Sequence, residues 1–309
     1  MWRMWFLSLR RRRQLRQLGK SWRFGMTSRR EQQWLRRYAA HSYRGAGAIV
    51  DLGCFLGGTT IALAEGLALN RRAQRQQIHA YDLFIWNEGY EAWARGTELQ
   101  GRFTAGESFL PEFLNRTERW RDYIIVHKGD LRDARWTGGP IEFLYIDAMK
   151  SPRVATAIAL NFFAHLIPDK SYIAHQDYPH YVTWWIHILA YRLRDYFGFA
   201  VDLPQSTLFR LEREIDLQLL ASDLSPAAVS PAEIEAAFDY SLRLVGKNKR
   251  ANVIAAKATA YVARGELARA DEIIKQSRYG PASMANEFNT VKALIERKLA
   301  GAKQSEHVI

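Results

Sequence analysis

The sequence contains very little cysteine and no long hydrophobic run. Its single cysteine, Cys54, excludes internal disulfides and is typical of a protein from a reducing cytosol. Apolar and aromatic residues gather at positions 2–7, but this run is far too short to span a bilayer. The arginines follow the run, unlike those of a secretory signal. We therefore expect a cytoplasmic globular protein with an ample core.

Acidic residues are almost absent from the first 50 positions, which hold thirteen Lys and Arg but only one acid, Glu31. This excess of twelve equals the net charge of the whole chain, +12, so residues 51–309 are neutral overall. We interpret residues 1–28 as a basic, aromatic segment. It suits a solvated extension, a peripheral contact with an anionic membrane surface, or a contact with nucleic acid phosphates, the last being less favoured.

Two common nucleotide-binding fingerprints are missing, because the glycines of residues 53–58 have neither the dinucleotide spacing nor a following Gly-Lys-Ser/Thr. What is present is a short apolar run ending near an acid, Ala48–Leu52, which predicts a buried parallel strand. Gly53, Gly57 and Gly58 follow it, and residues 60–69 have helical spacing. A strand, a glycine turn and a helix form the first half of a nucleotide-binding unit, although an ordinary tight turn has the same pattern.

Four more strand candidates follow, each ending close to an acid, and a hairpin closes the series. The carboxyl ends of parallel strands share one edge of a sheet, where ligands bind. We therefore expect the acids to line one site. The predicted strands are 78–84, 123–127, 141–147 and 171–178, the hairpin is 199–203 with 207–211, and the acids are Asp51, Asp82, Asp130, Asp147 and Asp177.

Asp51-x-Gly53-x-x-x-Gly57, followed by this order of segments, resembles class I S-adenosylmethionine-dependent methyltransferases over about residues 30–212. The resemblance implies an α/β fold with a doubly wound, mostly parallel seven-stranded sheet. It also implies that Asp51, Gly53 and Gly57 bind S-adenosylmethionine and that Asp82 accepts hydrogen bonds from the ribose. Asp130 would border the adenine, with Asp133 as a competing candidate.

Asp147-x-x-Lys150 and the later pair Gln176-Asp177 resemble the metal-dependent O-methyltransferases, namely the catechol, caffeoyl-coenzyme A and macrocin-type sugar enzymes. The resemblance implies a divalent metal, magnesium by its oxygen ligands, at Asp147, Gln176 and Asp177. Lys150 would take the acceptor proton if its pKa is lowered. Gln176 departs from the usual acid, and the neighbouring His175 and His180 are candidates to compensate. Alternatively, these groups only hold loops together.

The last third of the chain is helical in pattern, with one hairpin at Ala255–Ala270 that resembles a tetratricopeptide unit. We therefore expect a basic segment at 1–28, a methyltransferase domain at 29–212 and a helical region at 213–309. The predicted function is O-methylation of a hydroxyl on a small molecule or glycan. The alternatives are an RNA methyltransferase and a non-catalytic scaffold that acts through its helical tail.

Overall fold

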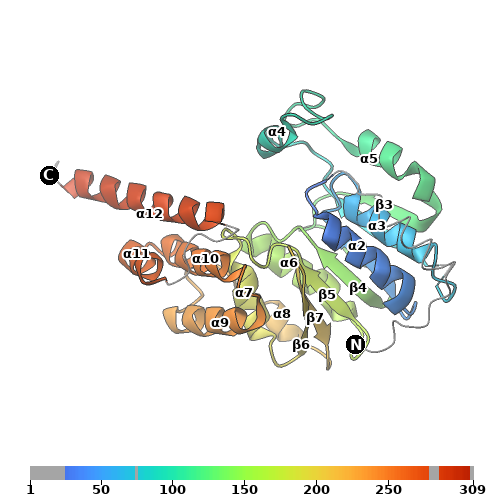
Figure 1. Ribbon diagram of the computed structural model, residues 1–309. Coiled ribbons are helices and arrows are strands. Elements are labelled where there is room, and N and C mark those ends of the chain that lie inside the picture. Colours follow the sequence, from blue (N-terminus) through green and yellow to red (C-terminus); the bar gives the residue numbers. More distant parts are fainter. Residues whose placement is uncertain (1–24, 74–75, 278–284, 307–309) are drawn as a thin grey trace. The chain divides into compact units, whose positions relative to one another are not determined.

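The computed structural model describes residues 25–73, 76–277 and 285–306. Positions 1–24 of the predicted basic segment lie outside this part of the chain. The strands form a seven-stranded sheet of order β3-β2-β1-β4-β5-β7-β6 (Figure 1). Their bounds are β1 Ala48–Leu52, β2 Ile78–Asp82, β3 Ile124–Lys128, β4 Ile141–Ile146, β5 Tyr172–His175, β6 Phe197–Asp202 and β7 Thr207–Leu211.

Burial along the strands separates central strands from edge strands. Every residue of β1 and β4 is buried, so both faces of these strands are covered, as in doubly wound sheets. The outer strands β3 and β6 expose part of their length. The predicted α/β fold with a mostly parallel sheet is therefore confirmed.

The chain divides into two compact units, residues 1–129 and 130–309. In the first, β1 and β3 each pair in parallel with β2. Its helical elements are α2 Arg29–Arg37, a π-helical turn at Tyr38–Ser42, α3 Gly58–Leu67, α4 Glu88–Ala94, α5 Leu110–Thr117 and the 3₁₀ segment Glu118–Tyr123.

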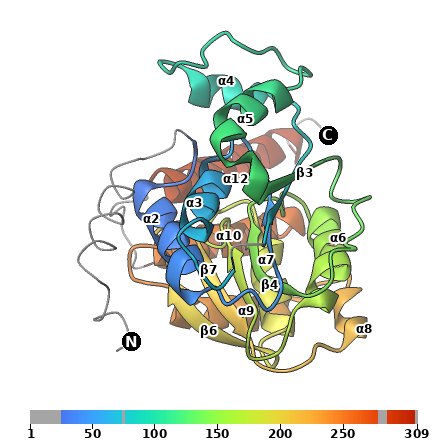
Figure 2. The ribbon, with the colours of Figure 1, turned by 90° about the vertical axis from the view of Figure 1, so that its right-hand side faces the viewer.

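Helices α2 and α3 lie side by side in both views (Figures 1 and 2). Two features bring them together. The buried guanidinium of Arg36 donates from Nε to the equally buried Glu65 carboxylate at 2.5 Å. On α3, Gly66 faces the end of α2 so closely that a Cβ would lie 2.3 Å from Arg36 O and 2.8 Å from the Cβ of Ala39 in the π-helical turn that follows α2. A charge pair and a missing side chain thus fix this packing.

In the second unit β5 pairs in parallel with β4 and antiparallel with β7, which in turn pairs with β6. The predicted closing hairpin is therefore present. No helix in the described ranges is long and apolar enough to cross a membrane. The helical elements are α6 Pro152–Phe162, the 3₁₀ turn Phe163–His165, α7 Trp184–Arg192, α8 Leu217–Leu220, α9 Pro231–Leu244, α10 Arg250–Ala263, α11 Leu267–Gln276 and α12 Ala285–Glu306.

The C-terminal helices belong to the same unit as β4–β7 and bind the loop that follows β5. The buried hydroxyl of Tyr178 in this loop shares a hydrogen bond of 2.8 Å with Ser241 of α9. The ring nitrogen Nδ1 of His187 on α7 lies 2.9 Å from the same serine oxygen. The backbone N–H of Tyr181 donates to Glu287 of α12 at 3.1 Å. The helical region therefore supports the loop that carries Asp177.

Replacing Tyr178 with Phe tests this support. The substitution removes the hydroxyl and leaves Ser241 with its other partners. A typical buried hydrogen bond contributes about 1 kcal/mol, and we expect the free energy of unfolding to fall by about that amount. Urea denaturation measures the change. Tyr123→Phe is the control, since the Tyr123 hydroxyl has no hydrogen bond to another described residue, and equal losses in the two variants would contradict the assignment.

Candidate functional site

The loop between β1 and α3, residues 53–57, is called the glycine loop below. Its shape depends on glycines in the left-handed region of backbone conformation. Gly53 and Gly57 both have φ of 83°, which residues with a side chain rarely adopt. The N–H of Gly53 donates to Tyr81 O of β2 at 2.8 Å, so the loop is fastened to the neighbouring strand end. Gly57 is the N-cap residue of α3. The first turn of α3 thus directs its backbone N–H groups toward the space beside the loop.

Gly57 also has no room for a side chain. A Cβ there would lie 2.9 Å from Thr117 and 3.2 Å from the Phe113 ring. Gly57→Ala should therefore combine backbone strain with a clash. Gly101 has a similar φ of 70° and open space around it, so Gly101→Ala carries the strain alone. We expect Gly57→Ala to lose about 2 kcal/mol more stability than Gly101→Ala in urea denaturation, and equal losses would contradict the steric argument.

Asp51, at the end of β1, is fully buried. The hydroxyls of Thr59 and Thr60 donate to one carboxylate oxygen, Oδ2, at 2.8 and 2.6 Å. The other oxygen, Oδ1, accepts no hydrogen bond within the described part of the chain. Burial raises the pKa of Asp51 to about 6, against the opposing effect of the two hydroxyls. Asp51 thus ties the start of α3 to β1.

Asp82, at the end of β2, accepts a hydrogen bond from the glycine loop through one carboxylate oxygen and from the residues that follow β2 through the other. Oδ2 accepts from the N–H of Phe55 at 2.9 Å, and Oδ1 accepts from the N–H of Phe84 at 2.8 Å. Both phenylalanines have positive φ, 46° and 55°, so the carboxylate stabilises strained backbone on either side of it. Each oxygen has two lone pairs and can accept a further hydrogen bond. The sequence predicted the acid but not its contact with Phe55.

In the second unit, the structure brings together both predicted catalytic residues, Asp147 and Lys150, and one predicted metal ligand, Asp177. The Lys150 ammonium donates to Asp147 Oδ1 at 2.7 Å and also to Asp177 Oδ2. Partial burial lowers the pKa of Lys150, but the two carboxylates outweigh it and hold that pKa above its ordinary value. The proton-accepting role expected for Lys150 required a lowered pKa. This arrangement gives the opposite direction, because Asp147, three positions earlier in the chain, and Asp177, 27 positions later, both stabilise the charged ammonium.

The loops that carry these residues are anchored by buried groups. The Trp185 indole N–H donates to Met149 O at 2.8 Å, and the Gln176 N–H donates to Ile146 O at 2.9 Å. His175, which directly precedes Gln176 at the end of β5, is buried. Burial lowers its pKa to about 4 despite the nearby Asp177. His175 is therefore neutral at physiological pH. His180 accepts from the Val182 N–H at 3.3 Å.

Asp130 lies at the start of the second unit, and its carboxylate is held by Arg132. The guanidinium Nε of Arg132 lies 3.0 and 2.9 Å from the two oxygens, and the Arg132 N–H adds a bond of 2.8 Å. These hydrogen bonds from Arg132 lower the pKa of Asp130. A contact of Asp130 with adenine would have to share the carboxylate with this guanidinium, and that role stays a prediction.

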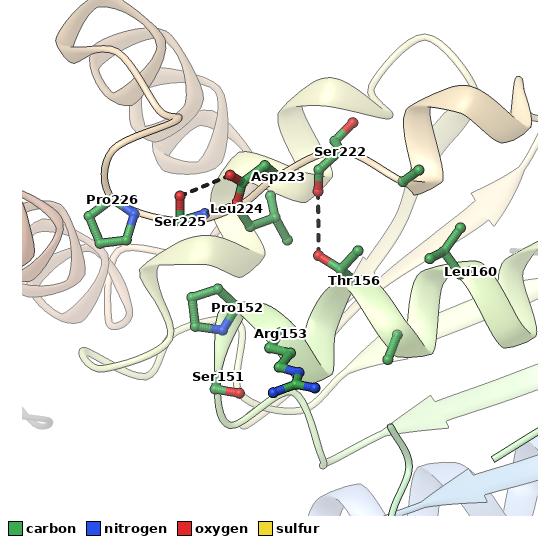
Figure 3. A pocket seen from close by; sticks show the side chains of 12 residues that line it. Ser151, Pro152, Arg153, Thr156, Leu160, Ser222, Asp223, Leu224, Ser225 and Pro226 are labelled. Atoms are coloured by element: carbon green, nitrogen blue, oxygen red, sulfur yellow. Dashed lines mark hydrogen bonds between the residues drawn. The ribbon is translucent and has the colours of Figure 1, made fainter. Parts of the chain in front are cut away.

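A cavity of about 560 Å³ is lined by Ser151, the residue that follows Lys150, and by later residues of the second unit. One wall is a face of α6 from Ser151 to Leu160, and the other is the segment 221–226 (Figure 3). The walls meet where the Thr156 hydroxyl donates to Ser222 O at 3.4 Å. Arg153 supplies a positive charge at the α6 end. The cavity is mostly apolar and adjoins the Asp147–Lys150 loop.

The donor set can be compared with the predicted metal. Within the described residues, no group of three or more His, Cys, Asp or Glu could hold a metal ion. Magnesium, however, is commonly bound by one or two carboxylates, with waters and substrate oxygens completing its shell. Asp147 and Asp177 already converge on one cationic group, Lys150 Nζ. Their hard oxygens fit magnesium in type and number.

The order of elements decides the fold. Five strands from βα units are followed by the antiparallel β6–β7 hairpin, as the sequence predicted. This strand order and its closing hairpin are those that the resemblance to class I methyltransferases implies. No family model and no curated protein matches it.

Several solved structures resemble the chain at low identity. The O-methyltransferase NovP is 14% identical with a TM-score of 0.48, and the match covers 66% of this chain and 89% of NovP. Calicheamicin methyltransferase CalS11 is 14% identical with a TM-score of 0.42, over 66% of this chain and 94% of its own. Phosphoethanolamine N-methyltransferase 1 of Haemonchus contortus is 16% identical with a TM-score of 0.40, over 65% and 48%. Identities of this size transfer neither an acceptor nor a metal to this chain.

Proposed function

We propose that this protein is an S-adenosylmethionine-dependent methyltransferase that methylates a hydroxyl of a small molecule or glycan with the help of magnesium. The observation that carries the proposal is the pair of hydrogen bonds that Asp82 accepts, one from the N–H of Phe55 in the glycine loop and one from the N–H of Phe84 after β2. This acid follows the second strand, where nucleotide-binding folds place a carboxylate against ribose hydroxyls.

The first unit supports binding of the methyl donor. Gly53 and Gly57 keep side chains out of the loop, and the first turn of α3 offers free N–H groups beside it. A carboxylate has about four acceptor positions, so Asp82 is suited to accept from ribose hydroxyls as well as from backbone N–H groups. S-adenosylmethionine supplies an electrophilic methyl on a good leaving group, so the protein chiefly has to align donor and acceptor.

The second unit supports activation of a hydroxyl. The acceptor oxygen must lose its proton as the methyl bond forms. The protonated Lys150 lies between Asp147 and Asp177, so it suits stabilisation of the developing oxygen anion, and a carboxylate that does not bind the metal suits acceptance of the proton. Asp147, Asp177 and Gln176 would hold magnesium, which lowers the pKa of an oxygen bound to it.

Transfer of labelled methyl from S-adenosylmethionine into a cell extract tests this function. We expect a labelled product with a methyl ether, and a rate lowered about 100-fold by Asp147→Asn. Asp169→Asn, at an exposed side chain of the same unit, is the control. Loss of labelling on chelation and recovery with magnesium would support the metal. Labelling unaffected by chelation would remove the metal from the proposal, and no labelled product would contradict the activity.

A further inference from the structure

Three half-buried aromatic rings of the first unit lie together, one from the glycine loop and two from α4. The Phe55 ring lies 4.9 Å from the ring of Tyr90 and 5.3 Å from that of Trp93, measured between centroids. Tyr90 and Trp93 are three positions apart on α4, so both side chains occupy one face of that helix. Phe55, Tyr90 and Trp93 together are called the aromatic face below.

A fully buried aromatic layer supports this face. The Phe109 ring lies 5.3 Å from Phe55, and the Trp86 ring lies 6.1 Å from it. Both side chains are almost completely buried. The Trp86 indole N–H donates to Glu91 of α4 at 2.8 Å, which fixes the helix over the layer. The half-buried rings are therefore held by a rigid base, which limits the entropy lost when a ligand binds to them.

The aromatic face adjoins the donor site through one residue. The N–H of Phe55 is bonded to Asp82, the acid assigned to the ribose, while the ring of Phe55 belongs to the face. A compound resting on these rings would lie beside the bound methyl donor. Aromatic side chains bind ring compounds by stacking or by contact with a face of C–H groups. Open-chain alcohols have no such rigid face and bind to aromatic side chains far less well.

We propose that the aromatic face is the binding site for the methyl acceptor and that the acceptor presents a ring to it. This inference rests on the proposed function. It adds the class of acceptor, a ring-bearing hydroxyl compound, and it makes Tyr90 and Trp93 determinants of specificity. The ring can be aromatic, which offers a flat π face, or a pyranose, which offers an apolar face of C–H groups.

Saturation-transfer NMR on the full chain with S-adenosylhomocysteine tests the proposal. The probes are phenol, methyl β-glucopyranoside and the open-chain control glycerol. We expect saturation of at least one ring probe and not of glycerol. Trp93→Leu and Tyr90→Leu keep apolar bulk but remove a ring, and each should weaken the ring signal roughly three- to tenfold. Trp93→Phe should restore most of it.

Trp120→Ala removes another half-buried tryptophan of the same unit and should change nothing. The proposal is overturned if no ring probe is saturated, if glycerol is saturated equally, or if both leucine variants keep the wild-type signal. Binding of labelled S-adenosylhomocysteine is measured separately on the same samples. If the cofactor product fails to bind while ring probes depend on Trp93, the methyltransferase function fails and the ring site remains.

Discussion

Asp82→Asn should weaken binding of S-adenosylhomocysteine about 100-fold in isothermal titration calorimetry. An amide has one oxygen where the carboxylate has two, so it cannot accept from both Phe55 and Phe84 and also from two ribose hydroxyls. Hydrogen bonds to a charged acceptor contribute about 1.5–3 kcal/mol each, and loss of one or two of them gives an effect of this size.

Asp122→Asn is the matched control for this experiment, because the Asp122 side chain is 91% exposed in the same unit. It should bind S-adenosylhomocysteine as the wild type does. Urea denaturation of Asp82→Asn identifies any loss of folded protein, so that affinity is compared between folded samples. Wild-type affinity in folded Asp82→Asn would show that this carboxylate does not bind the ribose.

Replacement of Asp51 should change how stability depends on pH. Burial raises the pKa of Asp51 from 3.8 to about 6, so the folded protein binds this proton more tightly than the unfolded chain. The contribution of Asp51 to stability is then complete below pH 3.8 and is lost as the pH rises to about 6. The loss between pH 4.5 and pH 7 is about 2 kcal/mol.

Asp51→Asn has no proton to lose, so this part of the pH dependence should disappear. Denaturation curves at pH 4.5 and pH 7 give the change in unfolding free energy for each protein. We expect the stability of the wild type relative to Asp51→Asn to fall by about 2 kcal/mol between the two pH values. Any constant cost of the amide cancels in this comparison. Asp122→Asn should retain the wild-type dependence, and a retained dependence in Asp51→Asn would contradict the raised pKa.

The strands were predictable because their signals are local. The bounds of β1 were predicted to the residue, because the apolar run is ended by Gly53 and no contact with a distant segment shifts either end of the strand. The hairpin β6–β7 follows from two apolar runs around Pro204. Helix α7 begins only at Trp184, although β5 ends at His175. The residues before it are held in turns by partners such as Glu287, 106 positions away, which no local pattern reveals.

The position of the acids at strand ends was predictable from the sequence, but the contacts that these acids make with other side chains were not. Position at strand ends identified Asp82 and Asp147. Nothing near Lys150 in the sequence indicated that Asp177 would raise its pKa. The part played by Phe55 depends on a left-handed backbone conformation that the sequence does not specify. Contacts between distant segments therefore decide the chemistry, while local patterns decide the fold.

Photo-crosslinking of labelled S-adenosylmethionine to the full chain, followed by peptide mapping, tests whether the methyl donor binds at the glycine loop and Asp82. Cleavage after arginine yields peptides 45–71 and 76–95, which contain the glycine loop, Asp82 and α4. We expect the label in one or both of these peptides, and we expect S-adenosylhomocysteine to displace it. Label confined to other peptides, or label that S-adenosylhomocysteine does not displace, would contradict binding at this site.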